Sequence, residues 1–274
     1  MPGDESYRRS GFFDLFAERH ALAQLLVGGK VVLDTCAGTA WGTREFFLPK
    51  ASLVVATDRS LEALTHYGFR DISAVVCDAL SLSWRAERFD LVVALESIEH
   101  LAREDGSLYV AEMGRVVKRD GVVVGSTPIC PHDGLIPFFR EQNPYHLYAY
   151  THRELATKLN AVFAETFIAP RWNETNPYWI FMAAHTPGRL HKADAEAFIR
   201  AVRSDTPEKR AIRVQWLRVW SDELDRRGQR VAAREVLARA RGESPRDPGV
   251  WKAFVRLHVP RRLWQGMRQL AGRC

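Results

Sequence analysis

The stretch from Lys30 to Ser60, KVVLDTCAGTAWGTREFFLPKASLVVATDRS, constrains the fold most, because its pattern predicts a strand, a tight turn, a helix and a second strand. Val31 to Leu33 is a short apolar run without polar alternation, as expected for a parallel strand buried on both faces. Residues 35–42 are small apart from Trp41, so the backbone can turn sharply and approach a ligand. We therefore expect an α/β unit with a binding site at the strand ends.

Acidic residues close three of the predicted strands. Asp34 ends the first strand, Asp58 ends the strand 53–56, and Asp78 ends the strand 74–77. An acid at the second strand tip is where nucleotide-binding folds hold a ribose hydroxyl pair, and an acid at the third tip can accept from an adenine amino group. The turn lacks G-x-G-x-x-G and begins at an acid that would repel a pyrophosphate. The sequence therefore favours an adenosine ligand with a cationic amino group and no phosphate.

Two sets of motifs connect the chain to a known family. VLDTCAGTAWGT resembles motif I of the class I S-adenosylmethionine (SAM) dependent methyltransferases, D-x-G-x-G-x-G, with Cys36 and Ala40 at the flanking glycine positions and Gly38 at the middle one. ESIEHL, GSTP and NPYHLYAYTHREL follow in an order that resembles the subgroup associated with bacterial glycan, polysaccharide or small-metabolite O-methylation. The resemblance covers roughly residues 10–185. It implies a Rossmann-like, seven-stranded α/β sheet and SAM as the cofactor.

The resemblance also implies which residues contact the cofactor. Asp58 would hold the ribose hydroxyls, and Asp78 the adenine amino group. The predicted cofactor-binding residues are Asp34, Thr35, Cys36, Ala37, Gly38, Trp41, Gly42, Thr43, Asp58, Arg59, Ser60, Cys77, Asp78, Ala79 and Glu96. A strand, turn and helix without any ligand is the alternative. Three acids at successive strand ends argue against it, because without a ligand each carboxylate would lie beside others of the same charge.

Histidines supply the candidate catalytic groups. Methyl transfer from a sulfonium needs alignment and exclusion of water, and an alcohol acceptor must also lose its proton. His100 follows the fourth predicted strand, 91–95, and is the candidate general base, because imidazole titrates near neutrality. Glu99 would orient it, and His146 is the second candidate. The predicted acceptor-binding residues are Tyr145, His146, Tyr148 and Tyr150, since aromatic and hydroxyl groups suit a sugar ring. Packing roles are the competing interpretation.

A metal-dependent alternative uses some of the same residues. Glu96, Glu99, His100 and His146 resemble the E-x-x-E-H and later His of the small-RNA 3′-end 2′-O-methyltransferases, which implies a cation on the terminal ribose hydroxyls. Residues 1–186 carry 18 Lys and Arg against 23 Asp and Glu, a net charge of −5 and a poor surface for a phosphate backbone. We therefore expect neither a metal ion nor a nucleic-acid partner.

The other expected elements are predicted from weaker signals. The turn Lys118–Gly121 would precede the strand 121–128, the segment 128–150 would form a loop over the site, and residues 193–274 would be helical. The remaining expected elements are helices over 12–27, 108–117 and 154–160 and strands over 162–169 and 179–184. The predicted domains are therefore a methyltransferase domain, 1–186, and a basic helical domain, 187–274.

The C-terminal domain carries the positive charge of the chain, 21 Lys and Arg against 10 Asp and Glu. Within 220–245, Gly228, Ala233, Leu237, Ala240 and Pro245 resemble a tetratricopeptide repeat. The terminal stretch 261–274 predicts an amphipathic, Arg-rich helix that docks on the domain, or on an anionic membrane surface. Contact with a protein partner is the other use of such helices.

Composition bounds the remaining choices. With 274 residues, 46% of them hydrophobic, the chain can bury a large core. The four cysteines form no C-x-x-C pair and the N-terminus lacks a signal peptide's apolar core, so a reducing cytoplasm is expected. The function that we predict is SAM-dependent methylation of a hydroxyl on a sugar, glycan or small metabolite. The alternatives are metal-dependent RNA ribose 2′-O-methylation and a noncatalytic scaffold that binds SAM or no ligand.

Overall fold

The computed structural model of the protein describes residues 12–259, which divide into two compact units. The first unit runs to Ile129 and resumes over Arg140–Ser204. The second combines Cys130–Phe139 with the chain from Asp205 onward. The predicted boundary after residue 186 differs from this division, because the helix that follows it packs on the first unit.

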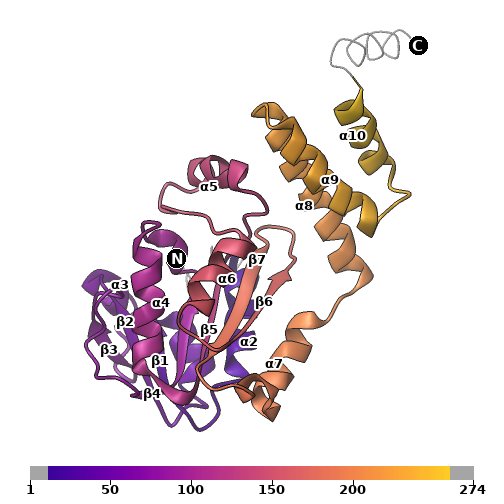
Figure 1. The fold of residues 1–274 in the computed structure, drawn as a ribbon. Helices are drawn as coiled ribbons and strands as arrows, with labels where there is room; N and C mark the ends of the chain where they lie inside the picture. Colours follow the sequence, from indigo (N-terminus) through magenta and orange to yellow (C-terminus); the bar gives the residue numbers. More distant parts are fainter. Residues whose placement is uncertain (1–11, 260–274) are drawn as a thin grey trace. The chain divides into compact units, whose positions relative to one another are not determined.

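The first unit is built on one seven-stranded sheet, as the sequence predicted (Figure 1). Its strands are β1 (Val31–Thr35), β2 (Leu53–Asp58), β3 (Ser73–Val76), β4 (Phe89–Leu95), β5 (Val117–Pro128), β6 (Glu165–Arg171) and β7 (Tyr178–Ala184). The order across the sheet is β3-β2-β1-β4-β5-β7-β6, in which β7 runs opposite to the other six strands. The chain reverses its winding direction between β1 and β4, where open α/β sheets bind their ligands.

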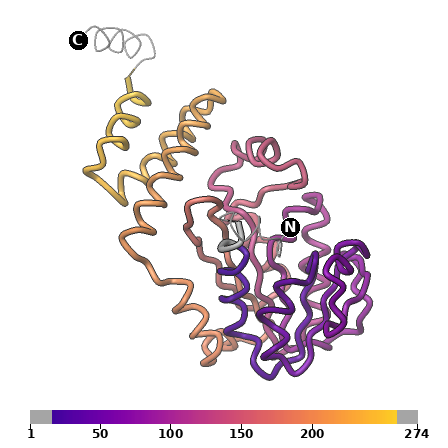
Figure 2. Tube along the Cα trace, turned by 180° about the vertical axis from the view of Figure 1, so that it is seen from behind, coloured from indigo at the N-terminus to yellow at the C-terminus, as the bar shows by residue number. Residues whose placement is uncertain are grey.

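Helices cover both faces of this sheet. Figure 1 shows α4 (Asp105–Val116) and α6 (His152–Asn160) in front of it, and the view from behind in Figure 2 brings α2 (Phe12–Gln24) and α7 (Ala193–Arg203) forward. The short elements are α3 (Leu61–Thr65), a π-helical turn η1 (Thr43–Phe47) and the 3₁₀ turns η2 (Ile98–His100) and η4 (Arg189–His191). The sequence thus placed the main helices correctly, with ends that differ by a few residues.

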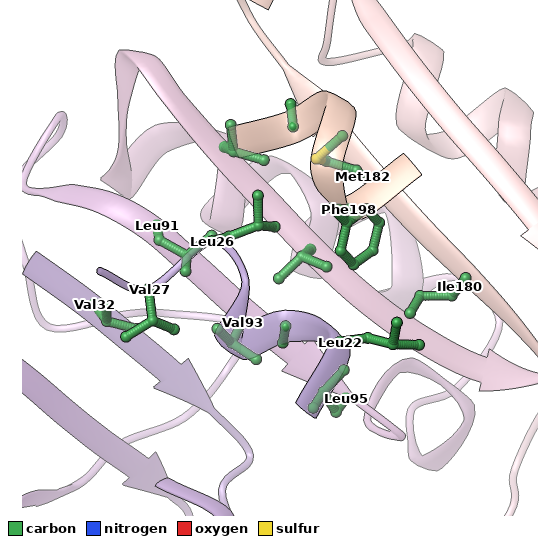
Figure 3. Close-up of a cluster of buried hydrophobic side chains, with 14 of the residues drawn as sticks. Leu22, Leu26, Val27, Val32, Leu91, Val93, Leu95, Ile180, Met182 and Phe198 are labelled. Atoms are coloured by element: carbon green, nitrogen blue, oxygen red, sulfur yellow. The ribbon is translucent and has the colours of Figure 1, made fainter. Parts of the chain in front are cut away.

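The core between α2, α7 and the sheet explains why the first unit extends past residue 186 (Figure 3). Leu22 of α2 and Leu26 of the turn that follows it meet Ile180 and Met182 of β7. Phe198 of α7 completes the cluster with its side chain fully buried. Burying a phenylalanine side chain contributes about 2–3 kcal/mol. Helix α7 is therefore part of the fold of the first unit.

Strand β5 begins earlier than the sequence indicated. Lys118 to Gly121, predicted as a turn, belong to β5, and the pairing with β4 shifts register between Phe89 and Leu91. This irregularity accommodates the extra residues as a bulge. Lys118 Nζ binds the Asp90 carboxylate at 2.6 Å, which holds the bulged stretch against β4. The turn prediction was wrong because polar residues and a glycine occur in bulged strands as well as in turns.

The segment 128–150, predicted as a loop, contains the 3₁₀ turn η3 (Asp133–Leu135) and the helix α5 (Ile136–Gln142). Leu135 is fully buried, whereas α5 buries none of its side chains. A helix without a buried face leaves no apolar period in the sequence, so the pattern could not reveal it. Gly134 lies against Gln229, since a Cβ at Gly134 would fall 1.7 Å from Gln229 Oε1.

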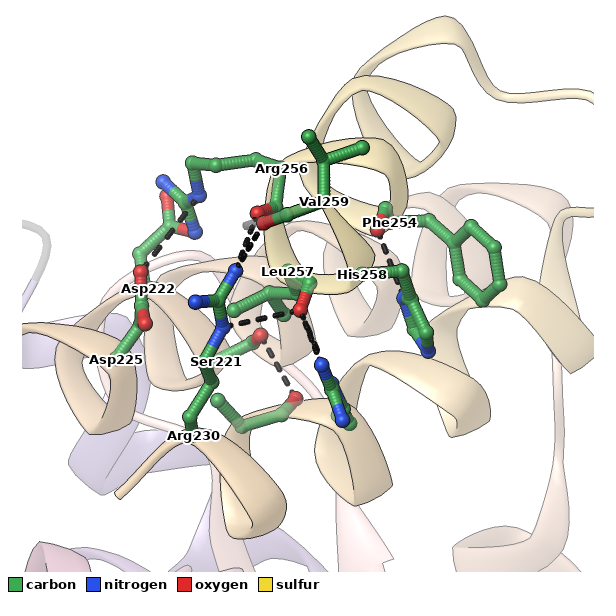
Figure 4. Close-up of polar contacts among 11 residues, drawn as sticks. Ser221, Asp222, Asp225, Arg230, Phe254, Arg256, Leu257, His258 and Val259 are labelled. Atoms are coloured by element: carbon green, nitrogen blue, oxygen red, sulfur yellow. Dashed lines mark hydrogen bonds and ion pairs between the residues drawn. The ribbon is translucent and has the colours of Figure 1, made fainter. Parts of the chain in front are cut away.

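The second unit is helical, as expected, and consists mainly of α8 (Pro207–Arg226), α9 (Arg230–Glu243) and α10 (Pro248–His258). Arg230 of α9 fastens the end of α10 by donating to the backbone carbonyls of Arg256, Leu257 and Val259 at 2.6–3.0 Å (Figure 4). Cationic side chains at a helix C-terminus satisfy carbonyls that lack an intrahelical partner. The resemblance to a tetratricopeptide repeat stays a prediction, and the predicted terminal helix lies outside the described residues.

Candidate functional site

A cavity of about 600 Å³ opens at the carboxyl ends of β1, β2, β3 and β4. Eight of the predicted cofactor residues line it: Cys36, Gly38, Asp58, Arg59, Cys77, Asp78, Ala79 and Glu96. His100, the candidate base, lines it as well. The sequence analysis missed six further lining residues, which are Leu80, Ser97, Leu101, Ala102, Asp105 and Leu147. Their only sequence signal was proximity to the motifs, because the topology brings these loops together.

The turn after β1 keeps a left-handed backbone at all three motif positions. The φ angles are 53° at Cys36, 56° at Gly38 and 54° at Ala40. A left-handed conformation costs a residue with a Cβ about 1–2 kcal/mol, so Cys36 and Ala40 are held in place by their surroundings. Ala40 is buried, and the Ala37 N–H donates to the Thr57 carbonyl at 2.8 Å. The two replacements therefore preserve the shape of a glycine-rich turn.

Asp58 is positioned by two backbone groups at the tip of β2. Its Oδ2 accepts from the Gly38 N–H at 3.0 Å, and its Oδ1 accepts from the Ser60 N–H at 2.9 Å. Ser60 in turn caps α3 through the Ala63 N–H. The carboxylate lines the cavity with its remaining acceptor capacity available, because each oxygen can accept more than one hydrogen bond.

Asp34 lies beneath the turn instead of on the cavity wall. Its residue is 3% exposed, and its Oδ2 accepts from the Thr43 hydroxyl at 2.6 Å. Burial, offset in part by that hydrogen bond, raises the pKa of Asp34 from 3.8 to about 7. Asp58 adds to this effect by charge repulsion. Asp34 therefore supports the turn from within.

Several other predicted cofactor residues also lie off the cavity wall. Thr35, Ala37, Trp41, Gly42, Thr43 and Ser60 are not among the lining residues. Gly42 has a packing role, because a Cβ there would fall 2.0 Å from Nε2 of His20 on α2. Trp41 packs against His20 and Phe46. These residues shape the turn and join it to α2.

Glu99, His100 and His146 come together at one edge of the cavity. One ligand-type atom from each lies within 4.8 Å of the others, and the two imidazole centroids are 5.0 Å apart. His100 is exposed and its Nδ1 lies 2.9 Å from the Tyr145 carbonyl oxygen. Because that oxygen can only accept, Nδ1 carries the proton and Nε2 carries the lone pair.

The environments of these three residues differ. Glu99 is 1% exposed, and burial, together with the neighbouring Glu96, raises the pKa of its carboxyl well above the usual range. Burial lowers the pKa of His146 to about 4, with His100 adding to the effect by charge repulsion. His146 is therefore a neutral imidazole at physiological pH.

Glu96 is separate from this cluster. Its Oε1 binds Arg19 Nε at 3.2 Å and accepts from the Ser126 hydroxyl at 2.8 Å. Its φ of 49° places the backbone in the left-handed region at the end of β4. These contacts aim Glu96 at the cavity wall and supply the cationic partner that Glu99 lacks.

The predicted acceptor tyrosines are divided by the fold. Tyr145 is 77% exposed, and Tyr148 donates its hydroxyl to Glu154 at 2.8 Å. Tyr150 is fully buried, with its hydroxyl against Gly106 of α4. Tyr150 is thus a packing residue, and Leu147 is the member of this segment that lines the cavity. Alternating sequence positions did not distinguish these environments.

Comparison with known families identifies this arrangement. Residues 33–125, which include the turn, Asp58 and His100, match a family model described as a methyltransferase domain. Over these residues the chain is similar to a methyltransferase domain. This match supports SAM as the cofactor. The domain supplies residues that fit such a ligand, since an oriented carboxylate, Asp58, and the apolar Ala79 and Leu80 line one cavity. No curated protein matches the sequence.

Solved structures share the methyltransferase fold. A SAM-dependent methyltransferase from Archaeoglobus fulgidus is 16% identical, with a TM-score of 0.55 over 66% of this chain and 97% of that chain. Phosphoethanolamine N-methyltransferase 2 from Haemonchus contortus, in complex with phosphomonomethylethanolamine and S-adenosylhomocysteine, is 16% identical, with a TM-score of 0.53 over 62% of this chain and 52% of that chain. At these identities the likeness shows the fold of the sheet and its helices.

Proposed function

We propose that the protein transfers the methyl group of SAM to a hydroxyl of a sugar, a glycan or another small hydroxylated metabolite. The observation that carries this proposal is the position of His100, whose imidazole lines the cavity with Nδ1 held by the Tyr145 carbonyl. Nε2 can therefore accept a proton from an acceptor hydroxyl beside the cofactor. A histidine that only packed would have no need to line the cavity.

The residues of the domain have distinct roles in this reaction. When bound, SAM supplies an electrophilic methyl group on a sulfonium. Asp58 holds the ribose hydroxyls, Asp78 lies where an adenine amino group can be accepted, and the left-handed turn at Gly38 lets the backbone approach the ligand. His100 takes the acceptor proton at Nε2, and Tyr145 keeps the ring in the required tautomer.

The charge of the cavity bears on the class of acceptor. Its lining includes the carboxylates of Asp58, Asp78, Glu96 and Asp105, against one arginine, Arg59. Four carboxylates oppose a phosphorylated acceptor and admit a neutral, polyhydroxylated one. The net charge of −5 over residues 1–186 argues in the same direction against RNA. An amine acceptor would also be admitted, so the assay must identify the methylated atom.

A cytoplasmic location remains part of the proposal. Among residues 12–259, no helix is long and apolar enough to cross a membrane. We also retain as proposals an acceptor from glycan or small-metabolite biosynthesis, and a protein or membrane-surface partner for the basic C-terminal helices.

The scaffold alternative is weakened by the turn, which keeps its left-handed shape at Cys36 and Ala40 at the cost of backbone strain.

The test begins with calorimetric titration of the purified chain with SAM and S-adenosylhomocysteine. Methyl transfer from labelled SAM is then measured on a panel of sugars, amino sugars and hydroxylated metabolites, with the methylated atom assigned by NMR. His100→Ala should bind SAM normally and lose roughly 10²–10⁴-fold in turnover. His66→Ala, which removes an exposed imidazole elsewhere, is the matched control. Full activity of His100→Ala would remove its role, and absence of SAM binding would favour a scaffold.

A further inference from the structure

We propose that Glu99, His100 and His146 form a binding site for one divalent transition-metal ion at the edge of the cavity. The site lies within the first unit, on η2 and on the segment before α6. The sequence analysis expected no metal ion, since E-x-x-E-H alone does not show which side chains meet. The fold brings together two imidazoles and one carboxylate and leaves out Glu96.

The strongest indication is the buried carboxylate of Glu99. It is 1% exposed, and within the described residues neither of its oxygens has a hydrogen-bond partner of normal geometry. The Arg19 guanidinium pairs with Glu96 instead. A buried carboxylate without donors is costly unless a cation compensates it. Coordination would supply that compensation.

His100 is oriented by a hydrogen bond of the kind that metal-binding histidines commonly make. Nδ1 of His100 donates to the Tyr145 carbonyl at 2.9 Å, which leaves Nε2 as the ring nitrogen that can bind an ion. Metal-binding histidines usually donate their second ring nitrogen to a carbonyl or carboxylate, which fixes the tautomer and orientation. The geometry of His100 therefore includes the outer contact as well as the ligand.

The backbone fixes the His146 segment beside η2. The Tyr148 N–H donates to the Glu99 carbonyl at 3.1 Å, and the His146 N–H donates to the Asn143 carbonyl at 3.0 Å. Together with the contact between His100 and Tyr145, these bonds join segments that are 45 residues apart in the chain. The imidazole of His146 is half-buried there, and its ring stands at 81° to that of His100. The donor set is thus held by structure outside the three side chains.

The donors select the class of ion. Two imidazole nitrogens and one carboxylate oxygen suit Zn²⁺, Mn²⁺, Co²⁺ or Fe²⁺, whereas Mg²⁺ and Ca²⁺ prefer oxygen ligands throughout. Donor atoms lie up to 4.8 Å apart, and bonds of about 2.0–2.2 Å require them to approach more closely. Binding of an ion would draw the three side chains together by this amount. Three protein ligands leave open positions, as in catalytic metal sites.

A cation here would change how the acceptor hydroxyl loses its proton. This role of the cation rests on the proposed function. Since His100 lines the cavity, an open position on the ion can take the oxygen of an acceptor hydroxyl. A metal-bound hydroxyl loses its proton more readily, so the ion would serve proton removal and His100 would serve as its ligand. The free imidazole would then be the base only in the metal-free protein.

The test measures metal binding directly in the full chain. Chelator-treated protein is titrated with Co²⁺, followed by visible absorption, and with Mn²⁺, followed by electron paramagnetic resonance. We expect one saturable ion per chain, with Co²⁺ bands that report nitrogen ligands. Glu99→Gln and His146→Ala should each weaken binding by at least 10–100-fold, while His66→Ala should not. Retained S-adenosylhomocysteine binding shows that each variant is folded.

The outcomes separate this proposal from the proposed function. Weak, unsaturated binding, or equal affinity in both cluster variants and the control, would overturn the metal site. Methyl transfer is assayed separately in the chelated and metal-loaded protein, so activity without a metal would leave His100 as the base. A metal site in a protein that methylates no member of the panel would support the site and count against the acceptor class.

Discussion

Replacing Asp34 by Asn should stabilise the ligand-free protein at pH 8 and leave its stability nearly unchanged at pH 4. In the folded chain burial raises the pKa of Asp34 from 3.8 to about 7. Between these two values the folded state holds a proton that the unfolded state has lost. Stability contributed by Asp34 therefore falls as the pH rises through this window, and the whole penalty is present above pH 7.

The magnitude follows from the size of the shift. The difference between a pKa of 3.8 and one of about 7 corresponds to about 4 kcal/mol at pH 8. Asn removes the ionisation while its side-chain oxygen can still accept from the Thr43 hydroxyl. The amide group adds donors that the site must accommodate, so a gain of about 2–4 kcal/mol is expected.

Urea denaturation of the ligand-free protein at pH 4, 6 and 8 measures this difference. Asp71→Asn is the matched control, because Asp71 is exposed and its pair with Arg44 lies on the surface, where ion pairs contribute little to stability. A stability difference between Asp34→Asn and the wild type that stays constant from pH 4 to pH 8 would refute the reasoning, since it would mean that the Asp34 carboxyl is not desolvated.

Four further predictions concern the cofactor, the turn, the core and the extent of the first unit. Asp58→Ala should lower SAM affinity by roughly 10²-fold or more in calorimetry, since it removes charge-assisted hydrogen bonds, and unchanged affinity would exclude the ribose assignment. Ala40→Gly relieves a left-handed φ worth about 1–2 kcal/mol and should raise the denaturation midpoint, whereas a lower midpoint would mean that packing of the buried methyl dominates. Phe198→Ala should cost about 3–5 kcal/mol. A chain that ends at residue 204 should fold, whereas one that ends at residue 186 should not, because it lacks α7. Equal stability of the two chains would support the boundary predicted from sequence.

Local patterns determined much of the fold. Unbroken apolar runs revealed the buried parallel strands, and the acid at the tip of β2 was visible because strand ends interrupt such runs. Since parallel strands bring their carboxyl ends to one edge of the sheet, the sequence alone could place Asp58 and Asp78 at one site, and both line the cavity. Hydrophobic periodicity is a property of neighbouring residues, so the sequence alone was sufficient to place these strands and the acids at their ends.

Only the tertiary structure decided burial and long-range contact. Asp34 and Asp58 are both acids at strand tips, yet Asp34 lies beneath the turn and Asp58 on the cavity wall. Among residues 12–259, the buried carboxylate of Glu99 has no hydrogen-bond donor, and Arg19, from a distant helix, pairs with Glu96 instead. His146 reached the cluster through backbone bonds across the fold. Desolvation depends on every element that surrounds a group, and no local pattern contains that information.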